Sequence, residues 1–242
     1  MRSIVSRGLW VVCAIVTLAA AACAADAQIG FGGGGPGLGL YMPELTQVNA
    51  FLEDAGFPQL DGDLLLIGGS GRGGVVPGLT YGGAGWGAWI ESDTGTRHAD
   101  YGIGLGGFDL GYAVGGDAHS VLTLGAVMGG GGAEVVLTEH PVSSSDGWNP
   151  EGIIVEPTRQ IYDSAFVFVA PYVDMQIRLL PWMGIGLRAG YLLPFLELNG
   201  QDDGPLDAPD LALPGTYVRL SVVFGGLADL QSEPLAEESD SL

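Results

Sequence analysis

The stretch DMQIRLLPWMGIGLRAGYLL, residues 174–193, decides the fold because its side chains alternate in character with a period of two. Successive side chains of a β-strand point to opposite faces of the sheet, so this alternation predicts strands. A turn at residues 181–183 would join two strands into a hairpin and place Gln176 opposite Arg188. One face carries Asp174, Gln176, Arg178, Gly184, Gly186, Arg188 and Gly190, and the other carries Val173, Met175, Ile177, Leu179, Ile185, Leu187, Ala189, Tyr191 and Leu193.

The same two-faced alternation recurs elsewhere in the chain. In residues 101–113 glycines and Asp109 alternate with bulky apolar residues, and in residues 217–224 Arg219 lies opposite an apolar face. A soluble sandwich would cover its charged face with lysine and glutamate, but this face holds mainly glycine, and the chain has no lysine. In a membrane barrel, lipid covers the apolar face, and a lumen of about eight strands has room only for side chains.

Charged side chains inside such a barrel must pair, because an isolated charge in a dry interior is costly. We expect lumen ion pairs among six residues: Arg178, Arg188, Arg219, Asp109, Asp174 and Glu134. A structural role is favoured over transport, and side chains packed in this way would nearly close a pore.

The glycine-rich alternation predicts an all-β fold, an antiparallel up-and-down β-barrel of about eight strands. Seven strands are expected after residue 64, and residues 29–40 would supply an eighth strand or form a flexible lead-in. One short N-terminal amphipathic helix is expected from apolar residues at helical spacing. The expected boundaries are a signal peptide at 1–27, a glycine-rich lead-in at 28–42, a barrel at 43–226 that includes the helix at 43–55, and an acidic tail at 227–242.

Residues 1–27 have the order of an export signal, in which Arg2 and Arg7 precede an apolar run and a small-residue triplet. Cys23 follows three alanines, so lipidation of this cysteine is an alternative route of processing. Both cysteines lie in this leader, so no disulfide is expected in the mature chain. No later segment has the roughly 18 consecutive apolar residues of a conventional membrane-spanning helix.

Composition excludes one class of partner and favours another. The chain has 43 glycines, 15% charged residues and a formal net charge of −20. Such an acidic chain repels phosphate groups, which excludes nucleic acid as a partner. The expected partner is the lipid bilayer, and the sequence predicts no particular protein partner.

No catalytic residue, metal site or cofactor is predicted. His98, His119 and His140 are 21 residues apart, but a turn at 115–117 would separate His119 from the other two. Two histidines alone lack the three or four ligands that zinc normally takes. The acidic residues at 202–210 do not have the spacing of a calcium-binding loop, which favours a solvated acidic loop.

A resemblance supports the same class. In YVRLSVVF, residues 217–224, apolar positions alternate and the last residue is the aromatic Phe224. This strand and the general layout resemble the small outer-membrane β-barrel proteins of diderm bacteria. In that family the closing strand ends the chain, whereas eighteen residues follow Phe224 here, five of them acidic. Residues 45–74 are also similar to uncharacterised exported glycine-rich bacterial proteins, which have no settled activity to carry over.

Three functions are therefore considered. The first is a non-enzymatic outer-membrane β-barrel protein with a structural role or a narrow lumen. The second is a soluble or surface-attached β-scaffold in the periplasm or on the cell surface. The third is an outer-membrane lipid hydrolase that uses His140, a serine from residues 143–145 and Asp146, although adjacent loop serines more often form linkers.

Overall fold

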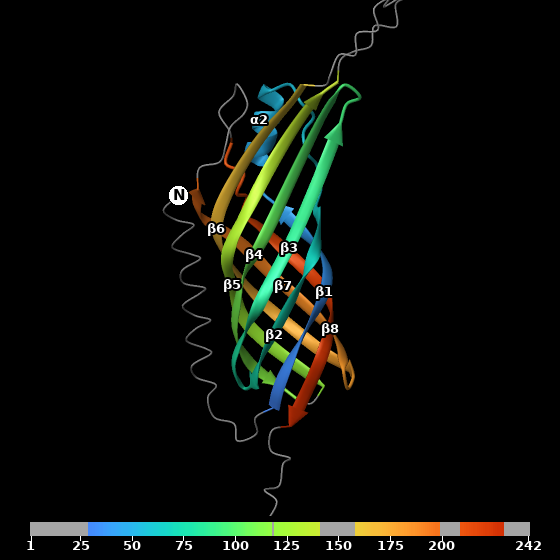
Figure 1. The fold of residues 1–242 in the computed structure, drawn as a ribbon, viewed down its shortest axis with the longest axis vertical. Coiled ribbons are helices and arrows are strands. Elements are labelled where there is room, and N and C mark those ends of the chain that lie inside the picture. Colours follow the sequence, from blue (N-terminus) through green and yellow to red (C-terminus); the bar gives the residue numbers. More distant parts are fainter. Residues whose placement is uncertain (1–28, 118, 141–157, 199–208, 230–242) are drawn as a thin grey trace, which may run out of the picture.

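In a computed structural model, described for residues 29–117, 119–140, 158–198 and 209–229, eight antiparallel strands close into a barrel (Figure 1). Each strand pairs with the next along the chain, and β1 pairs with β8. The predicted all-β up-and-down barrel with one helix is confirmed. The elements are β1 (Ile29–Pro43), α2 (Thr46–Asp54), β2 (Leu64–Val76), β3 (Gly78–Asp93), β4 (Arg97–Gly116), β5 (Ser120–Glu139), β6 (Thr158–Leu180), β7 (Met183–Leu198) and β8 (Gly215–Asp229).

The glycine-rich stretch at the start of the described chain is a barrel strand. β1 pairs with β2 along one edge and with β8 along the other, so the barrel begins at Ile29 and residues 29–42 are no separate lead-in. A Cβ on Gly35 or Gly39 would lie within 3.0 Å of a backbone oxygen of β8. Glycine at these inward positions therefore permits the close approach of the two strands that close the ring.

The β6–β7 hairpin has the predicted faces but a different register. Asp174 lies opposite Arg188, and Gln176 lies opposite Gly186, so the expected pairing of Gln176 with Arg188 is wrong by two residues. The turn contains two residues rather than three, and β6 has an irregularity just before it. A shift of two residues leaves every side chain on its original face, which is why the alternation predicted the faces correctly.

Large side chains fill the barrel interior. One apolar cluster occupies the half toward α2, and a smaller cluster of Phe31, Val76, Ala113 and Val121 occupies the other end. Trp86 belongs to the larger cluster and is only 6% exposed. The larger cluster includes Tyr41, Trp86, Tyr101, Phe166, Phe168, Tyr172 and Tyr217.

The helix and the residues before β8 cover one end of the barrel (Figure 1). α2 buries Val48 and Leu52 against this end, and the segment at 211–213 is buried beside them. The hydroxyl of Tyr41 donates to the backbone oxygen of Leu213 at 2.5 Å. The hydroxyl of Tyr101 makes a similar bond to Leu211 at 3.1 Å. These contacts close the mouth of the barrel with packed side chains, and we call this structure the cap.

A tight turn joins β4 and β5 at the opposite end of the barrel. One oxygen of the Asp117 carboxylate accepts the backbone N–H groups of His119 and Ser120, each at 2.8 Å. These two hydrogen bonds favour the ionised carboxylate and lower the pKa of Asp117 below its ordinary value. The turn therefore places His119 at one end of the β4–β5 hairpin, and His98 and His140 lie at the other end.

Candidate functional site

A charged cluster lies inside the barrel, between the two apolar clusters. Five strands each contribute one buried charged side chain, and each of these residues is at most 9% exposed. Burial of this degree requires ion pairs and hydrogen bonds, because water no longer solvates the charges. The cluster consists of Arg72 from β2, Asp109 from β4, Asp174 from β6, Arg188 from β7 and Arg219 from β8.

Arg188 is the centre of this cluster. Its Nη1 atom lies 2.9 Å from an oxygen of Asp109, and its Nε atom lies 2.9 Å from an oxygen of Asp174. The guanidinium carbon lies 3.8 Å from the centre of the Tyr172 ring, which adds a cation–π contact. One arginine therefore ties together β4, β6 and β7, of which β4 is not adjacent to the other two.

A second arginine extends the network to β2. Arg72 forms an ion pair with the other oxygen of Asp174, and its Nη1 atom donates to the Tyr172 hydroxyl at 3.4 Å. The Tyr172 hydroxyl in turn donates to Asp109. Arg72 was not among the predicted lumen residues, because in residues 68–74 glycine occupies both faces and the sequence does not show which face points inward.

Arg219 is buried but only partly paired. Its Nη2 atom donates to the hydroxyl of Ser70 at 2.6 Å, and its guanidinium lies 5.0 Å from the centre of the Trp86 ring. Its Nε and Nη1 atoms have no hydrogen-bond partner among the described residues. The buried charges of the described chain are thus three arginines and two aspartates, which leaves one positive charge in excess.

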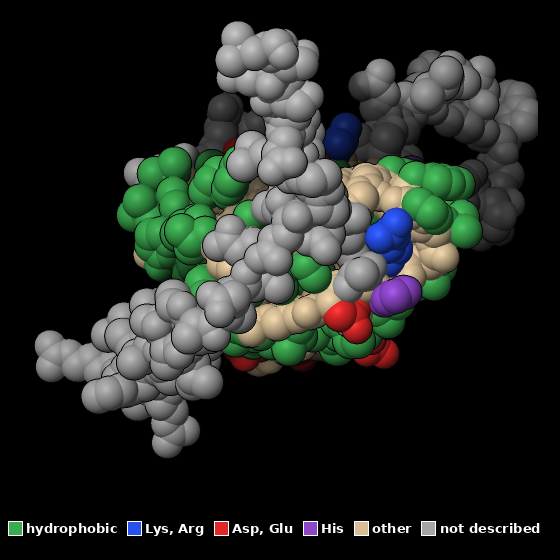
Figure 2. Space-filling model, turned by 90° about the horizontal axis from the view of Figure 1, so that it is seen from below, with side chains coloured by type: hydrophobic (Ala, Val, Ile, Leu, Met, Phe, Trp, Pro, Cys, Tyr) green, Lys and Arg blue, Asp and Glu red, His purple; other side chains and the backbone are tan. Residues whose placement is uncertain are grey.

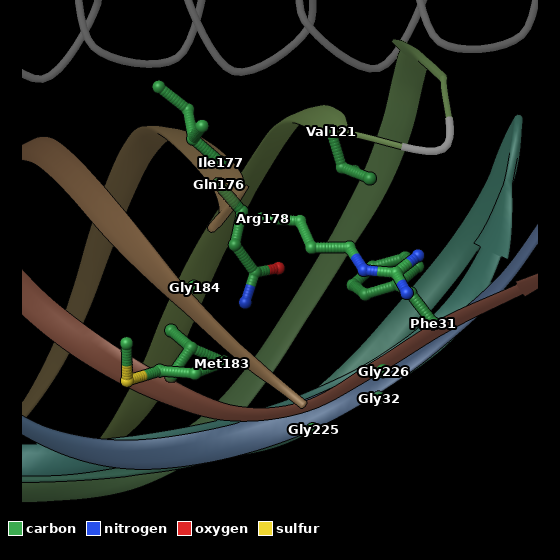
Figure 3. Close-up of a pocket in the computed structure, with 11 residues that line it drawn as sticks. Phe31, Gly32, Val121, Gln176, Ile177, Arg178, Met183, Gly184, Gly225 and Gly226 are labelled. Atoms are coloured by element: carbon green, nitrogen blue, oxygen red, sulfur yellow. The ribbon is translucent and has the colours of Figure 1, made fainter. Parts of the chain in front are cut away.

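The structure brings four of the six predicted residues together and leaves two apart. Asp109, Asp174, Arg188 and Arg219 lie in the cluster. Arg178 lies near the uncapped end, where its Nε atom donates to the backbone oxygen of Leu180 at 3.3 Å. Arg178 lines a cavity of about 30 Å³. Figure 3 shows its side chain extending toward Phe31.

Glu134 lies outside the cluster, on the outer face of β5. Its neighbours Ala133 and Val135 are buried, and Glu134 itself is exposed. On β5 the odd-numbered residues point inward, so the strand's own alternation excludes Glu134 from the interior. The prediction of Glu134 as a lumen ion-pair residue is therefore wrong.

The interior has little free volume. A cavity beside Arg72, Asp174 and Arg188 measures about 20 Å³, and another beside Trp86 and Tyr217 measures about 10 Å³. A space of this size holds about one water molecule. With the cap at one end, the arrangement suits a structural ion network better than passage of a solute.

The outer wall of the barrel is apolar on every strand. Figure 2, viewed from the end opposite α2, shows hydrophobic side chains around this wall. Each strand contributes a large apolar residue that is at least 45% exposed. One from each strand in order is Leu38, Leu65, Leu79, Phe108, Met128, Met175, Leu187 and Leu220. We call this surface the apolar belt.

Outward charged residues gather toward the capped end. Glu91, Asp100, Glu134 and Asp163 are outward residues in the parts of β3 to β6 that extend farthest toward the cap (Figure 1). The belt and this acidic rim therefore divide the outer surface along the barrel axis. The described part of the chain contains no helix with the length and apolar character of a membrane-spanning helix.

Comparison with known proteins identifies similar folds and no family. No protein-family model matches the sequence, and no curated protein matches it. A solved structure of Ail, the attachment invasion locus protein of Yersinia pestis, is similar at 9% identity and a TM-score of 0.42, covering 81% of this chain and 97% of Ail. Ail in complex with the heparin analogue sucrose octasulfate gives 10% identity and a TM-score of 0.41, with 83% and 99% covered.

The outer membrane protease OmpT from Escherichia coli is also similar, with 9% identity and a TM-score of 0.26 over 84% of this chain and 97% of OmpT. At these identities and TM-scores, no activity or ligand transfers from either protein to this chain. The functional argument therefore depends on the barrel's own surface and interior.

Proposed function

We propose that this protein is a non-enzymatic β-barrel of the outer membrane, which crosses the lipid with its eight strands and holds a closed interior. The apolar belt is the observation that supports this function most directly. Soluble monomers rarely expose contiguous apolar patches larger than a few hundred Å². Here exposed apolar side chains occur on every strand, and a bilayer is the solvent that would cover all of them.

The closed ring of strands supports the same proposal. Lipid offers no hydrogen bonds, so a membrane-spanning sheet must pair every strand edge within the protein. The pairing of β1 with β8 removes both free edges. Exposed aromatic residues lie toward both ends of the belt, with Trp89 toward the cap and Trp182 and Phe224 at the other end. Such positions suit the boundary between lipid and water.

The lengths of the connections give an orientation. β2 and β3, β4 and β5, and β6 and β7 are joined by one to three residues. At the capped end β3 and β4 are also joined by three residues, but the other connections are longer and one contains α2. Outer-membrane barrels have short periplasmic turns and longer extracellular loops. The cap and the acidic rim would therefore face the cell exterior.

The two alternative functions have less support. A soluble scaffold would need a partner covering the belt around the whole circumference. The lipid hydrolase was expected to use His140 with residues 143–146, which lie outside the described part of the chain. Other predicted features also lie outside it: the leader at 1–27, Cys23, the acidic residues at 202–207 and most of the tail. The charged cluster consists only of arginines and aspartates, so among the described residues it supplies no nucleophile with an adjacent general base.

Fractionation of cells tests the membrane location. We expect the protein to stay in the outer-membrane fraction after a high-salt wash and to migrate anomalously on gels unless it is boiled, because closed barrels resist detergent unfolding. Recovery in the salt wash, with the same mobility before and after boiling, would support the soluble scaffold instead.

The closed interior predicts the absence of a channel. Purified protein inserted in a planar bilayer should give no conductance steps, because the cap and the charged cluster leave cavities of about 10–30 Å³. Insertion should be verified in the same membrane by protease protection. Regular single-channel steps would show that the interior opens in lipid.

A further inference from the structure

The outer face of the β3–β4 hairpin carries four residues with metal-binding side chains. In the strand register Glu91 lies opposite Asp100, and Asp93 lies opposite His98, so the four form a square on neighbouring positions. All four point outward, because Ala99 between His98 and Asp100 is buried, and the exposed Glu91 and Asp93 lie opposite Asp100 and His98 in the register. We call Glu91, Asp93, His98 and Asp100 the hairpin square.

The side chains of the hairpin square converge. One potential ligand atom from each of Glu91, His98 and Asp100 lies within 4.8 Å of the other two. The Nε2 atom of His98 lies 2.9 Å from an oxygen of Asp100. The Nδ1 atom of His98 lies 3.7 Å from an oxygen of Asp93, which is too long for a hydrogen bond.

The charges of the square are unbalanced without a cation. Three carboxylates surround one imidazole, and like charges directly opposite one another on neighbouring strands are destabilising. The nearest basic residue in the sequence, Arg97, binds elsewhere, to Glu139 at 3.1 Å and to the backbone oxygen of Gly56 at 2.5 Å. The Nδ1 atom of His98 is shielded from solvent and has no hydrogen-bond partner among the described residues.

We infer that the hairpin square is a binding site for a divalent transition metal, with Zn²⁺ as the best-suited ion. Glu91, His98 and Asp100 would be the ligands, and Asp93 would orient the imidazole through its other nitrogen. A histidine that binds zinc usually donates its second N–H group to a carboxylate or carbonyl oxygen. Three protein ligands leave the fourth position of zinc open to water or to an external ligand.

The ligand types distinguish zinc from calcium and magnesium. Imidazole suits zinc, copper, iron and nickel, whereas calcium takes six to eight oxygen ligands. The square offers one nitrogen and a few carboxylate oxygens on a rigid pair of strands. Trp89, two residues before Glu91 on the same outer face, is 58% exposed, so the site lies just beyond the apolar belt on the capped side. Aqueous metal ions would reach it there.

Zinc titration of the purified, folded chain tests the site. Calorimetry should detect one tight Zn²⁺ per chain, and His98→Gln and Asp100→Asn should each weaken this binding by at least about tenfold. Asp93→Asn removes only the orienting carboxylate and should weaken it by about 10- to 100-fold. His119→Gln, the same substitution in the turn at the other end of the barrel, is the matched control and should leave the affinity unchanged.

Each outcome decides for or against the hairpin square. Unboiled gel mobility identifies the folded variants, and the Glu91→Gln protein provides a second ligand substitution if one variant fails to fold. A chain that binds no Zn²⁺, or a His98→Gln chain that retains full affinity, would overturn the inference. The inference would also be overturned if equimolar Ca²⁺ competed equally with Zn²⁺ for the site, because that result would indicate a carboxylate site in which the imidazole takes no part.

Discussion

Asp174→Ala is expected to destabilise the barrel by about 3–5 kcal/mol, which is the usual effect of removing one partner from a buried ion pair. Asp174 is the carboxylate that both Arg72 and Arg188 contact, so its loss leaves two buried guanidinium groups with reduced compensation. Urea unfolding in lipid vesicles, followed by tryptophan fluorescence or by the shift between folded and unfolded gel bands, measures the difference.

Asp163→Ala is the matched control, since Asp163 lies on the same strand but on the exposed outer face. The control should change the free energy of unfolding by no more than about 0.5 kcal/mol. Equal small effects of the two substitutions would show that the charged cluster does not stabilise the closed barrel. A large loss in Asp163→Ala would instead point to an unrecognised partner on the outer face.

Leu187→Arg should destabilise the barrel in a bilayer by about 2–4 kcal/mol, the range for a basic residue placed on the lipid face at the membrane midplane. Leu187 is 52% exposed, and its cross-strand neighbours on the belt are Met175 and Leu220. The charge would have to leave water for hydrocarbon. The same urea titration in vesicles gives the effect.

Thr216→Arg provides the comparison at the edge of the belt. Thr216 is exposed on β8 next to the capped end, where a charge reaches water, so we expect a change of at most about 1 kcal/mol. Depth dependence of this kind is specific to a bilayer. If Leu187→Arg and Thr216→Arg had the same small effect, the belt would not be in contact with lipid.

Local periodicity predicted the inward and outward faces of the strands, because each residue's side is set by its own position in an alternating strand. That is why Asp174, Arg188 and Arg219 were expected inside, and why the faces survived an error of two residues in the hairpin register. Arg72 and Glu134 lie where this alternation gives no answer. Around both residues the sequence carries glycine or apolar residues on both faces, so only the structure shows that Arg72 lies inside and Glu134 outside.

Contacts between distant strands were not predictable in the same way. Asp109 and Arg188 are 79 positions apart, on strands that are not neighbours in the sheet, and they meet only because the ring closes at β1 and β8. The cap is similar, since Tyr41 reaches Leu213 across 172 positions. The hairpin square also depends on strand pairing, because the register places Asp93 of β3 opposite His98 of β4 and Glu91 opposite Asp100.

The amino-acid sequence by itself determined the strand class, the two-faced wall and the separation of apolar from small and ionic residues, because these depend on spacing along one strand. The tertiary structure decided which arginine meets which aspartate, how the end is capped and where His98 finds its carboxylates. Those features depend on register and ring closure, and a shift of two residues changes every partner while leaving the alternation intact.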